Sequence, residues 1–69
     1  MTQCQRILKY IDDFGSITPL EAINDLGVMR LAARISDLNK MGERIVRETV
    51  HGRNRYNEPI HYARYKRAV

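Results

Sequence analysis

Apolar residues in the first part of the chain recur at spacings of three and four, which is the periodicity of an amphipathic helix. The first such stripe consists of Cys4, Ile7, Leu8 and Ile11, with Phe14 at its edge. Thr2 and Gln5 have the spacing of a capping box, in which each side chain bonds to the backbone of the other residue. Gly15 suits the left-handed residue that follows the last helical turn. The pattern therefore predicts a first helix between Thr2 and Gly15.

A second helix is predicted to begin at Thr18. The threonine hydroxyl can cap the first turn, Pro19 stands at the first helical position, and Glu21 supplies a carboxylate at the third. The apolar residues expected to face the core around this helix are Ile17, Ala22, Ile23 and Leu26. Gly27 is expected to end the helix after about two turns.

A third helix is predicted to start almost immediately after Gly27 and to stop at Gly42. Its apolar stripe consists of Val28, Leu31, Ile35 and Leu38. Two helices joined so tightly cannot be collinear, so both apolar faces are expected to meet the first helix. This is the geometry of a helix-turn-helix pair.

After Gly42 the pattern changes to that of β-strands. One predicted strand contains Ile45, Val46, Thr49 and Val50. A second covers residues 60–65, where Tyr62 and Tyr65 point to opposite faces, so at least one should pack on the helices. Residues 51–59 are rich in Gly, Asn and Pro and predict a hairpin loop. The expected fold is mainly α with a small β-hairpin, a winged helix-turn-helix of three helices and a two-stranded wing, forming a single domain over residues 1–69.

The net charge of +4 is distributed unevenly along the chain. Residues 1–29 carry two basic and four acidic side chains, a net charge of −2, whereas residues 30–69 carry ten basic and four acidic side chains, a net charge of +6. This asymmetry indicates one half that faces a polyanion and a supporting half that does not. Because many small proteins are mildly basic, charge alone leaves the nucleic-acid interpretation and a neutral one equally open.

The composition predicts a small cytoplasmic protein. No run of about 18 apolar residues occurs, and Lys9, Asp12 and Asp13 interrupt the most hydrophobic early stretch, so neither a membrane span nor a signal peptide is expected. A chain of 69 residues has room for one small core. Cys4 lies on the apolar side of the first predicted helix and is interpreted as a reduced core residue.

The face of the third predicted helix opposite its apolar stripe mixes cations with small side chains. On a helical wheel this face carries Met29, Arg30, Ala33, Ser36, Asp37 and Lys40, with Arg34 at its edge. The small side chains would let the helix approach base edges, while Arg30 can bond guanine at O6 and N7 and Lys40 can neutralise a phosphate. The alternative is a solvated face on which Arg34 pairs with Asp37 at three-residue spacing.

The predicted hairpin loop carries Arg53, Asn54 and Arg55 next to Gly52, with Tyr56 as its one aromatic residue. Because the two arginines cannot serve the core, contact with a DNA backbone or a minor groove is their simplest use. The alternative is a soluble edge hairpin that its charges protect from aggregation. Terminal cations either add phosphate contacts or remain disordered and solvated, and those of this chain are Arg64, Lys66 and Arg67.

Catalysis and metal binding have little support in the sequence. Asp12 and Asp13 are adjacent on a helix, so their side chains diverge, and no serine, histidine and acid set has an obvious shared site. His51, His61 and Cys4 do not have the spacing of zinc ligands. We therefore expect no enzyme, no metal site and no cofactor.

The sequence GSITPLEA at residues 15–22, followed by MRLAARISDL at residues 29–38, resembles small helix-turn-helix proteins of phages and prophages. The similarity continues through Gly42 and Ile45 to the Asn54 loop and residues 63–65, and so covers nearly the whole chain. The resemblance implies a winged helix-turn-helix domain that binds DNA. Members of this family tend to have a basic residue where this chain has Asn39, so the resemblance implies one positive charge fewer for DNA binding here.

Together these observations predict a double-stranded DNA-binding protein, with a role as a phage or prophage transcriptional regulator. The third helix is expected in the major groove and the basic wing on the backbone or in the minor groove. The residues expected at the DNA are Arg30, Ala33, Arg34, Ser36, Lys40, Arg53, Asn54 and Arg55. A monomer or weak homodimer is expected, because no further helix follows the hairpin. The alternative is a protein-interaction module that binds a host protein without touching DNA.

Overall fold

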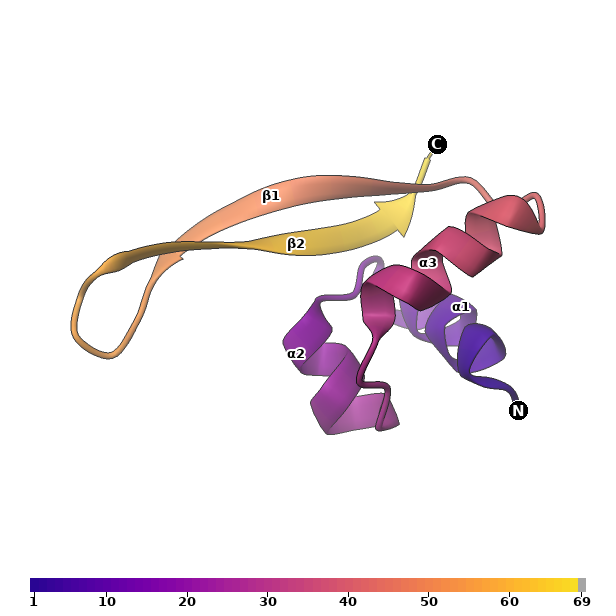
Figure 1. The fold of residues 1–69 in the computed structure, drawn as a ribbon, viewed down its shortest axis with the longest axis horizontal. Coiled ribbons are helices and arrows are strands. Elements are labelled where there is room, and N and C mark those ends of the chain that lie inside the picture. Colours follow the sequence, from indigo (N-terminus) through magenta and orange to yellow (C-terminus); the bar gives the residue numbers. More distant parts are fainter. Residues whose placement is uncertain (69) are drawn as a thin grey trace.

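The computed structural model describes residues 1–68 as a set of helices followed by an antiparallel hairpin (Figure 1). Helix α1 spans Gln3–Phe14, the second helix consists of α2 at Pro19–Glu21 and the π-helical segment η1 at Ala22–Leu26, α3 spans Leu31–Lys40, and strands β1 and β2 span Ile45–Arg53 and Pro59–Arg67. This order confirms the predicted winged helix-turn-helix fold. Within the described chain, none of the helices has the length and apolar composition needed to cross a lipid bilayer.

Both predicted capping boxes are present. At α1, the Gln5 backbone N–H donates to the Thr2 hydroxyl (3.1 Å), and the Thr2 N–H donates to the Gln5 side chain (2.8 Å). At α2, the same two bonds join Thr18 and Glu21, at 3.2 and 2.9 Å. Each box satisfies backbone donors that the first turn of a helix otherwise leaves without partners. The predicted starts of these two helices are therefore confirmed.

A single cluster of buried side chains connects the helices to the base of the hairpin. It consists of Ile7, Ile11, Ile17, Ala22, Val28, Leu31, Ile35, Leu38, Ile45 and Tyr65. Cys4, Leu8 and Leu26 pack against this cluster and are half-buried. The prediction that Ile23 faces the core is wrong, since its side chain is 41% exposed. Ile23 directly follows the buried Ala22 in η1, and adjacent helical residues point in different directions, so η1 buries Ala22 and leaves Ile23 exposed.

The prediction that the third helix begins almost at Gly27 is also wrong. Helix α3 begins at Leu31, and Arg30 before it has φ −123° and ψ 62°, which is not helical. Gly27 adopts a left-handed conformation with φ 68°, and residues 28–30 then form an open turn. Val28 fits the helical period because it is fully buried in this turn, not because it belongs to the helix.

The hairpin is longer than its β-branched residues indicate. The strands pair from Ile45 with Arg67 to Arg53 with Pro59, so the connecting loop covers only residues 54–58. Ile17 adds a one-residue bridge to β2, through backbone bonds of 2.9 and 2.8 Å with Tyr65. Tyr65 is 7% exposed and Tyr62 is 41% exposed, which confirms that one tyrosine packs on the helices while the other faces outward.

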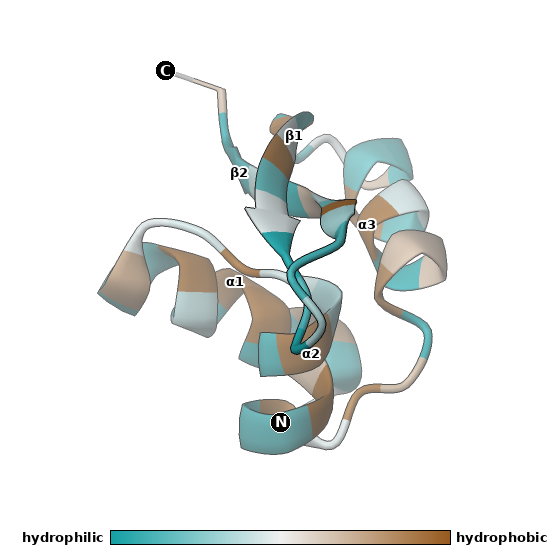
Figure 2. Cartoon of the chain, turned by 90° about the vertical axis from the view of Figure 1, so that its left-hand side faces the viewer, coloured by the Kyte–Doolittle hydropathy of each residue, from teal (hydrophilic) through white to brown (hydrophobic). Residues whose placement is uncertain are grey.

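The hairpin forms an arm that extends from the helical body. Figure 1 shows it leaving the C-terminal end of α3, running back along that helix and projecting past the helix's N-terminal end. Figure 2, turned by 90°, shows the tip of the arm facing the viewer with α3 to one side, and the tip is mainly hydrophilic. The arm contributes to the elongated shape, whose extents are 39 × 25 × 21 Å.

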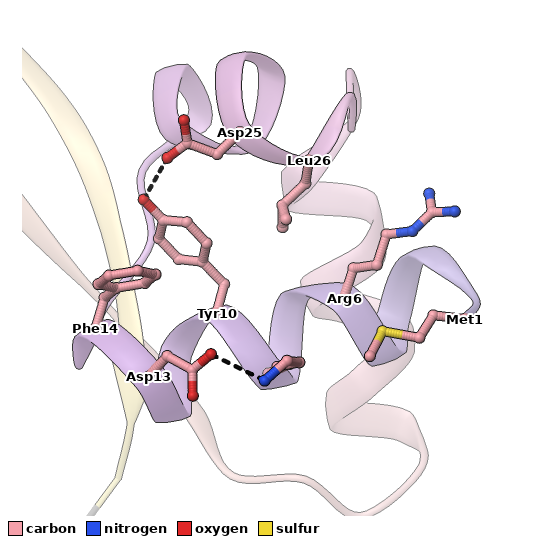
Figure 3. A pocket seen from close by; sticks show the side chains of 8 residues that line it. Met1, Arg6, Tyr10, Asp13, Phe14, Asp25 and Leu26 are labelled. Carbon is pink, nitrogen blue, oxygen red and sulfur yellow. Dashed lines mark hydrogen bonds and ion pairs between the residues drawn. The ribbon is translucent and has the colours of Figure 1, made fainter.

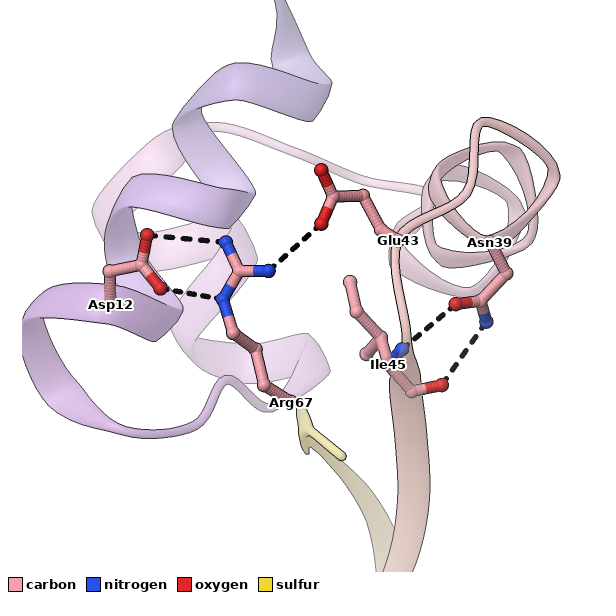
Figure 4. A network of polar contacts seen from close by, with 5 residues as sticks. All are labelled: Asp12, Asn39, Glu43, Ile45 and Arg67. Carbon is pink, nitrogen blue, oxygen red and sulfur yellow. Dashed lines mark hydrogen bonds and ion pairs between the residues drawn. The ribbon is translucent and has the colours of Figure 1, made fainter. Parts of the chain in front are cut away.

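Side chains fix the base of this arm (Figure 4). The Asn39 amide accepts a hydrogen bond from the Ile45 N–H (2.9 Å) and donates one to the Ile45 carbonyl (3.1 Å), so it pairs with the first residue of β1 as a neighbouring strand would. The Arg67 guanidinium donates to both oxygens of Asp12, at 2.7 and 3.2 Å, and to Glu43 at 2.8 Å. These contacts join the start of β1 and the end of β2 to the helices.

The terminal cations are therefore ordered and engaged, contrary to the alternative of a disordered end. Arg64 and Lys66 both contact Glu48 across the hairpin, at 2.6 and 3.1 Å. These contacts hold the pKa of Glu48 below its ordinary value of 4.5. Arg67, through its hydrogen bonds and charge, likewise lowers the pKa of Asp12. Three of the cations considered for phosphate contacts are thus already paired with carboxylates.

Candidate nucleic-acid interface

The outward face of α3 carries small side chains and one cation. Ala32, Ser36 and Lys40 are exposed and Ala33 is half-buried, while Leu31, Ile35 and Leu38 on the opposite face are buried. Ala33, Ser36 and Lys40 were expected on this face, and the structure places them there. Ala32 is a further exposed small residue. The small side chains of Ala32, Ala33 and Ser36 leave the helix backbone accessible to a partner lying against it, and Lys40 adds a positive charge at the end of the helix.

Arg30 stands before the first turn of α3 and not on its face, which corrects the helical-wheel prediction. It is exposed and occupies the N-cap position, where no side chain bonds to the first turn. The first turns of α1 and α2 are both closed by capping boxes. The N-terminal end of α3 therefore combines backbone N–H groups that lack a side-chain cap with an arginine, and both favour anions.

Arg34 is half-buried and bonded within α3. Its Nη2 atom lies 3.2 Å from an Asp37 carboxylate oxygen, which is the internal pair that three-residue spacing allows. Its Nε atom is buried and has no hydrogen-bond partner among the described residues. For Arg34, the structure thus shows the internal pairing that was considered as an alternative to an exposed contact.

The wing tip is organised by Asn54. Its side-chain oxygen accepts hydrogen bonds from the backbone N–H groups of Tyr56 (2.9 Å) and Glu58 (3.0 Å), and its amide nitrogen donates to the Glu58 carboxylate (3.0 Å). Asn57 has a positive φ of 61°, a conformation that asparagine tolerates better than most residues. The Asn54 side chain therefore holds the loop and is not directed at a partner.

The two wing arginines differ in their surroundings. Arg53 lies at the end of β1, and its guanidinium donates to the Asn57 carbonyl at 2.9 Å. Arg55 lies within the loop and is exposed. Neither contacts a carboxylate among the described residues. Tyr56, next to Arg55, is 81% exposed.

Ion pairs divide the surface into a neutralised part and a cationic part. The acidic partners of the paired cations lie on α1, on α3, between α3 and β1, and in the middle of β1. Within residues 1–68, the cations without a carboxylate at salt-bridge distance are Arg6, Arg30, Lys40, Arg44, Arg47, Arg53 and Arg55. Six of these seven follow the second helix. Arg44 and Arg47 were not selected from the sequence. Strand alternation would not have identified Arg47 as exposed, because it shares a face of β1 with the buried Ile45.

A separate pocket lies between α1 and η1 (Figure 3). The Tyr10 hydroxyl donates to Asp25 at 2.6 Å, and this bond raises the pKa of Tyr10 to about 12. Phe14 packs against Tyr10 with ring centroids 4.7 Å apart and is otherwise exposed. The Tyr10–Asp25 bond joins two helices whose apolar faces already meet in the core. We therefore interpret the Tyr10–Asp25 bond as a contact that stabilises the packing of α1 on η1.

Three helical elements, a short open turn before the third and a projecting hairpin define the class of winged helix-turn-helix proteins. Comparison with known families matches residues 2–67 to the family described as the winged helix-turn-helix domain, and the chain belongs to this family. Domains of this family generally bind DNA. The comparisons with curated proteins and with solved structures give no match.

Proposed function

We propose that this domain binds double-stranded DNA, with α3 in the major groove and the wing on the adjacent backbone or in the minor groove. The observation that carries the proposal is the position of the wing, which runs along α3 and projects past its N-terminal end (Figure 1). Arg53 and Arg55 on the wing and Arg30 at that end of α3 all lack a carboxylate partner among the described residues. Cations in two elements are thus available to one polyanion.

The residues of this interface have different roles in the proposal. Arg30 bonds a guanine edge, Lys40 neutralises a phosphate, and the small side chains of α3 allow close approach to the bases. Arg53 and Arg55 contact the backbone or enter a minor groove. Arg34 exchanges its bond with Asp37 for a phosphate, and Asn54 acts by positioning the loop. The small side chains of α3 that allow this approach are those of Ala33 and Ser36, with Ala32 beside them.

The biological role follows from the resemblance to phage and prophage proteins. We propose a transcriptional regulator of a phage or prophage that works in the cytoplasm as a single domain, as a monomer or weak homodimer. A selection of bound fragments from random duplexes distinguishes a single site from a symmetric pair.

Salt dependence tests the proposal directly. If about five phosphates are contacted, the logarithm of affinity for a duplex should fall with a slope near −4.5 against the logarithm of salt concentration. A preferred sequence should emerge from the selection, because specific sites bind more tightly than random ones. A parent protein that shifts no duplex even at low salt contradicts DNA binding.

A second candidate function is a protein-interaction module. A groove of about 540 Å³ lies between α2 and the first half of β2, and it is lined by Pro19, Leu20, Ile60 and Tyr62 among others. Leu20 is 66% exposed, and exposed apolar side chains that gather in one place are typical of binding surfaces. Retention of a host protein that is lost in Leu20→Ser, without any duplex shift by the parent, supports this function over DNA binding.

A further inference from the structure

Tyr56 is the most exposed of the large hydrophobic residues, with 81% of its surface accessible. It lies at the far end of the hairpin, where the helices bury nothing. Its side chain therefore does not contribute to the core, and its ring is accessible to a partner.

The loop that carries this ring is held in one shape. The Tyr56 N–H donates to the Asn54 side chain (2.9 Å), the Asn57 N–H donates to the Asn54 carbonyl (3.0 Å), and Arg53 bonds to the Asn57 carbonyl (2.9 Å). A loop already ordered in this way loses little conformational entropy when it binds. The loop that carries Tyr56 is therefore preorganised for binding.

The chemistry of the neighbouring residues indicates what the ring contacts. Arg53 and Arg55 flank the tip and can bind phosphates, whereas a phenol ring cannot neutralise them. The apolar surface available to a ring on a duplex is that of the sugars and base edges, and the minor groove is where apolar side chains enter beside arginines. We propose that Tyr56 enters the minor groove while the flanking arginines bind its phosphate walls. This inference rests on the proposed DNA-binding function and adds a residue that reads the groove.

A minor-groove contact has a distinctive dependence on base pairs. The guanine 2-amino group projects into the minor groove of G·C pairs, and hypoxanthine lacks this group while keeping the major-groove edge of guanine. A ring inserted in the minor groove should therefore tolerate I·C pairs better than G·C pairs. A contact in the major groove or on phosphates should not distinguish them.

The experiment measures the affinity of the intact chain for alternating dI·dC and dG·dC duplexes of equal length across a salt series. We expect the parent to bind the dI·dC duplex more tightly by about tenfold, a difference typical of one well-placed aromatic contact. Tyr56→Ala should remove this preference and leave the salt slope unchanged. Tyr56→Phe should retain it. Arg55→Ala should weaken binding to both duplexes, keep the preference, and reduce the salt slope by about 1.

The outcomes separate this inference from the function on which it rests. If the parent binds both duplexes equally, or if Tyr56→Ala keeps the preference, the minor-groove role of Tyr56 is wrong while DNA binding stands. If the parent binds neither duplex, the proposed function itself fails. Because Tyr56 lies outside the core, the thermal transition of Tyr56→Ala should match that of the parent, so a loss of preference cannot be assigned to unfolding.

Discussion

At the scale of single residues, side-chain amides perform structural work that their positions in the sequence do not reveal. Asn39 and Asn54 are both exposed as whole residues, yet each uses its amide to bond backbone groups. The Asn39 side chain bonds to both backbone groups of Ile45. This amide therefore joins the last turn of α3 directly to the start of β1.

This arrangement predicts a trade between stability and DNA affinity at position 39. Asn39→Ala should destabilise the domain by about 1 kcal/mol, because two backbone groups lose their partner. Asn39→Lys should lose the same bonds but add a cation, so its affinity for a duplex at low salt should rise and its salt slope should steepen by about 0.9. Chemical denaturation and duplex titrations measure the two effects. Equal denaturation midpoints for Asn39→Ala and the parent would contradict the role of this amide.

Arg30 gives a second test at the residue scale. If it bonds a guanine, Arg30→Ala should weaken binding to a selected site by about 1 to 3 kcal/mol and flatten the sequence preference. Arg6→Ala is the matched control, since Arg6 is also exposed and lacks a carboxylate partner among the described residues but lies on α1. Competition titrations with selected and scrambled duplexes separate the two. Equal losses on both duplexes would mean that Arg30 contacts phosphate only.

At the scale of elements, local signals were sufficient for the starts of α1 and α2 and insufficient for the start of α3 and for the hairpin. The capping boxes at Thr2 and Thr18 depend on residues three apart, so the sequence contains all the information needed to find them. The strands extend over polar residues 51–53 because cross-strand pairing, and not strand propensity, decides their length. The turn of residues 28–30 was missed because a buried residue in a turn can continue a helical period by coincidence.

In the candidate site too, local spacing predicted some features and did not determine others. Ala33, Ser36 and Lys40 share the outward face of α3, as helical spacing predicts. Arg34 and Asn54 were selected for their chemistry, but their internal partners depend on contacts that spacing alone left open. The contact between Arg67 and Asp12 joins residues 55 positions apart, and no local pattern encodes such a distance.

The hairpin's ion pairs predict how stability depends on pH. Arg64 and Lys66 lower the pKa of Glu48 in the folded protein from its ordinary value of 4.5, so the unfolded chain binds this proton more readily. The stabilisation is therefore complete well above pH 4.5 and is lost as the pH falls through the lowered pKa. Glu48→Gln should lower the melting temperature at pH 7 and should reduce its fall on acidification.

Glu58→Gln provides the control for this pH series. Glu58 lies at the other end of the hairpin and contacts no cation at salt-bridge distance among the described residues, and an amide oxygen can still accept the bond from Asn54. Its melting temperature at pH 7 should stay close to that of the parent. Parallel melting curves of Glu48→Gln and the parent from pH 7 to pH 3 would show that Glu48 does not stabilise the hairpin.

At the scale of the whole molecule, the unpaired cations are distributed differently from the residues that form the core. The helices before α3 and the segments that connect them supply half of the buried side chains and hold few cations without a carboxylate partner, whereas α3 and the hairpin carry most of these unpaired cations among the described residues. Helix α3 has both kinds of surface, because one of its faces is buried in the core and the other is exposed to solvent. The same substitution at two adjacent residues of α3 should therefore unfold the domain at the buried position and weaken only DNA binding at the exposed position.

Ile35→Asp and Ser36→Asp test this division with one introduced side chain. Ile35 is 5% exposed, and a carboxylate there would be buried without a partner at a cost of several kcal/mol. A domain of this size has a total stability of roughly 3–10 kcal/mol, so Ile35→Asp should abolish the cooperative thermal transition. Ser36→Asp, on the exposed face, should melt close to the parent but bind duplexes weakly, because the new charge faces the phosphates. A cooperative transition in Ile35→Asp would contradict the packing of α3, whereas full DNA affinity in Ser36→Asp would place the duplex on another surface.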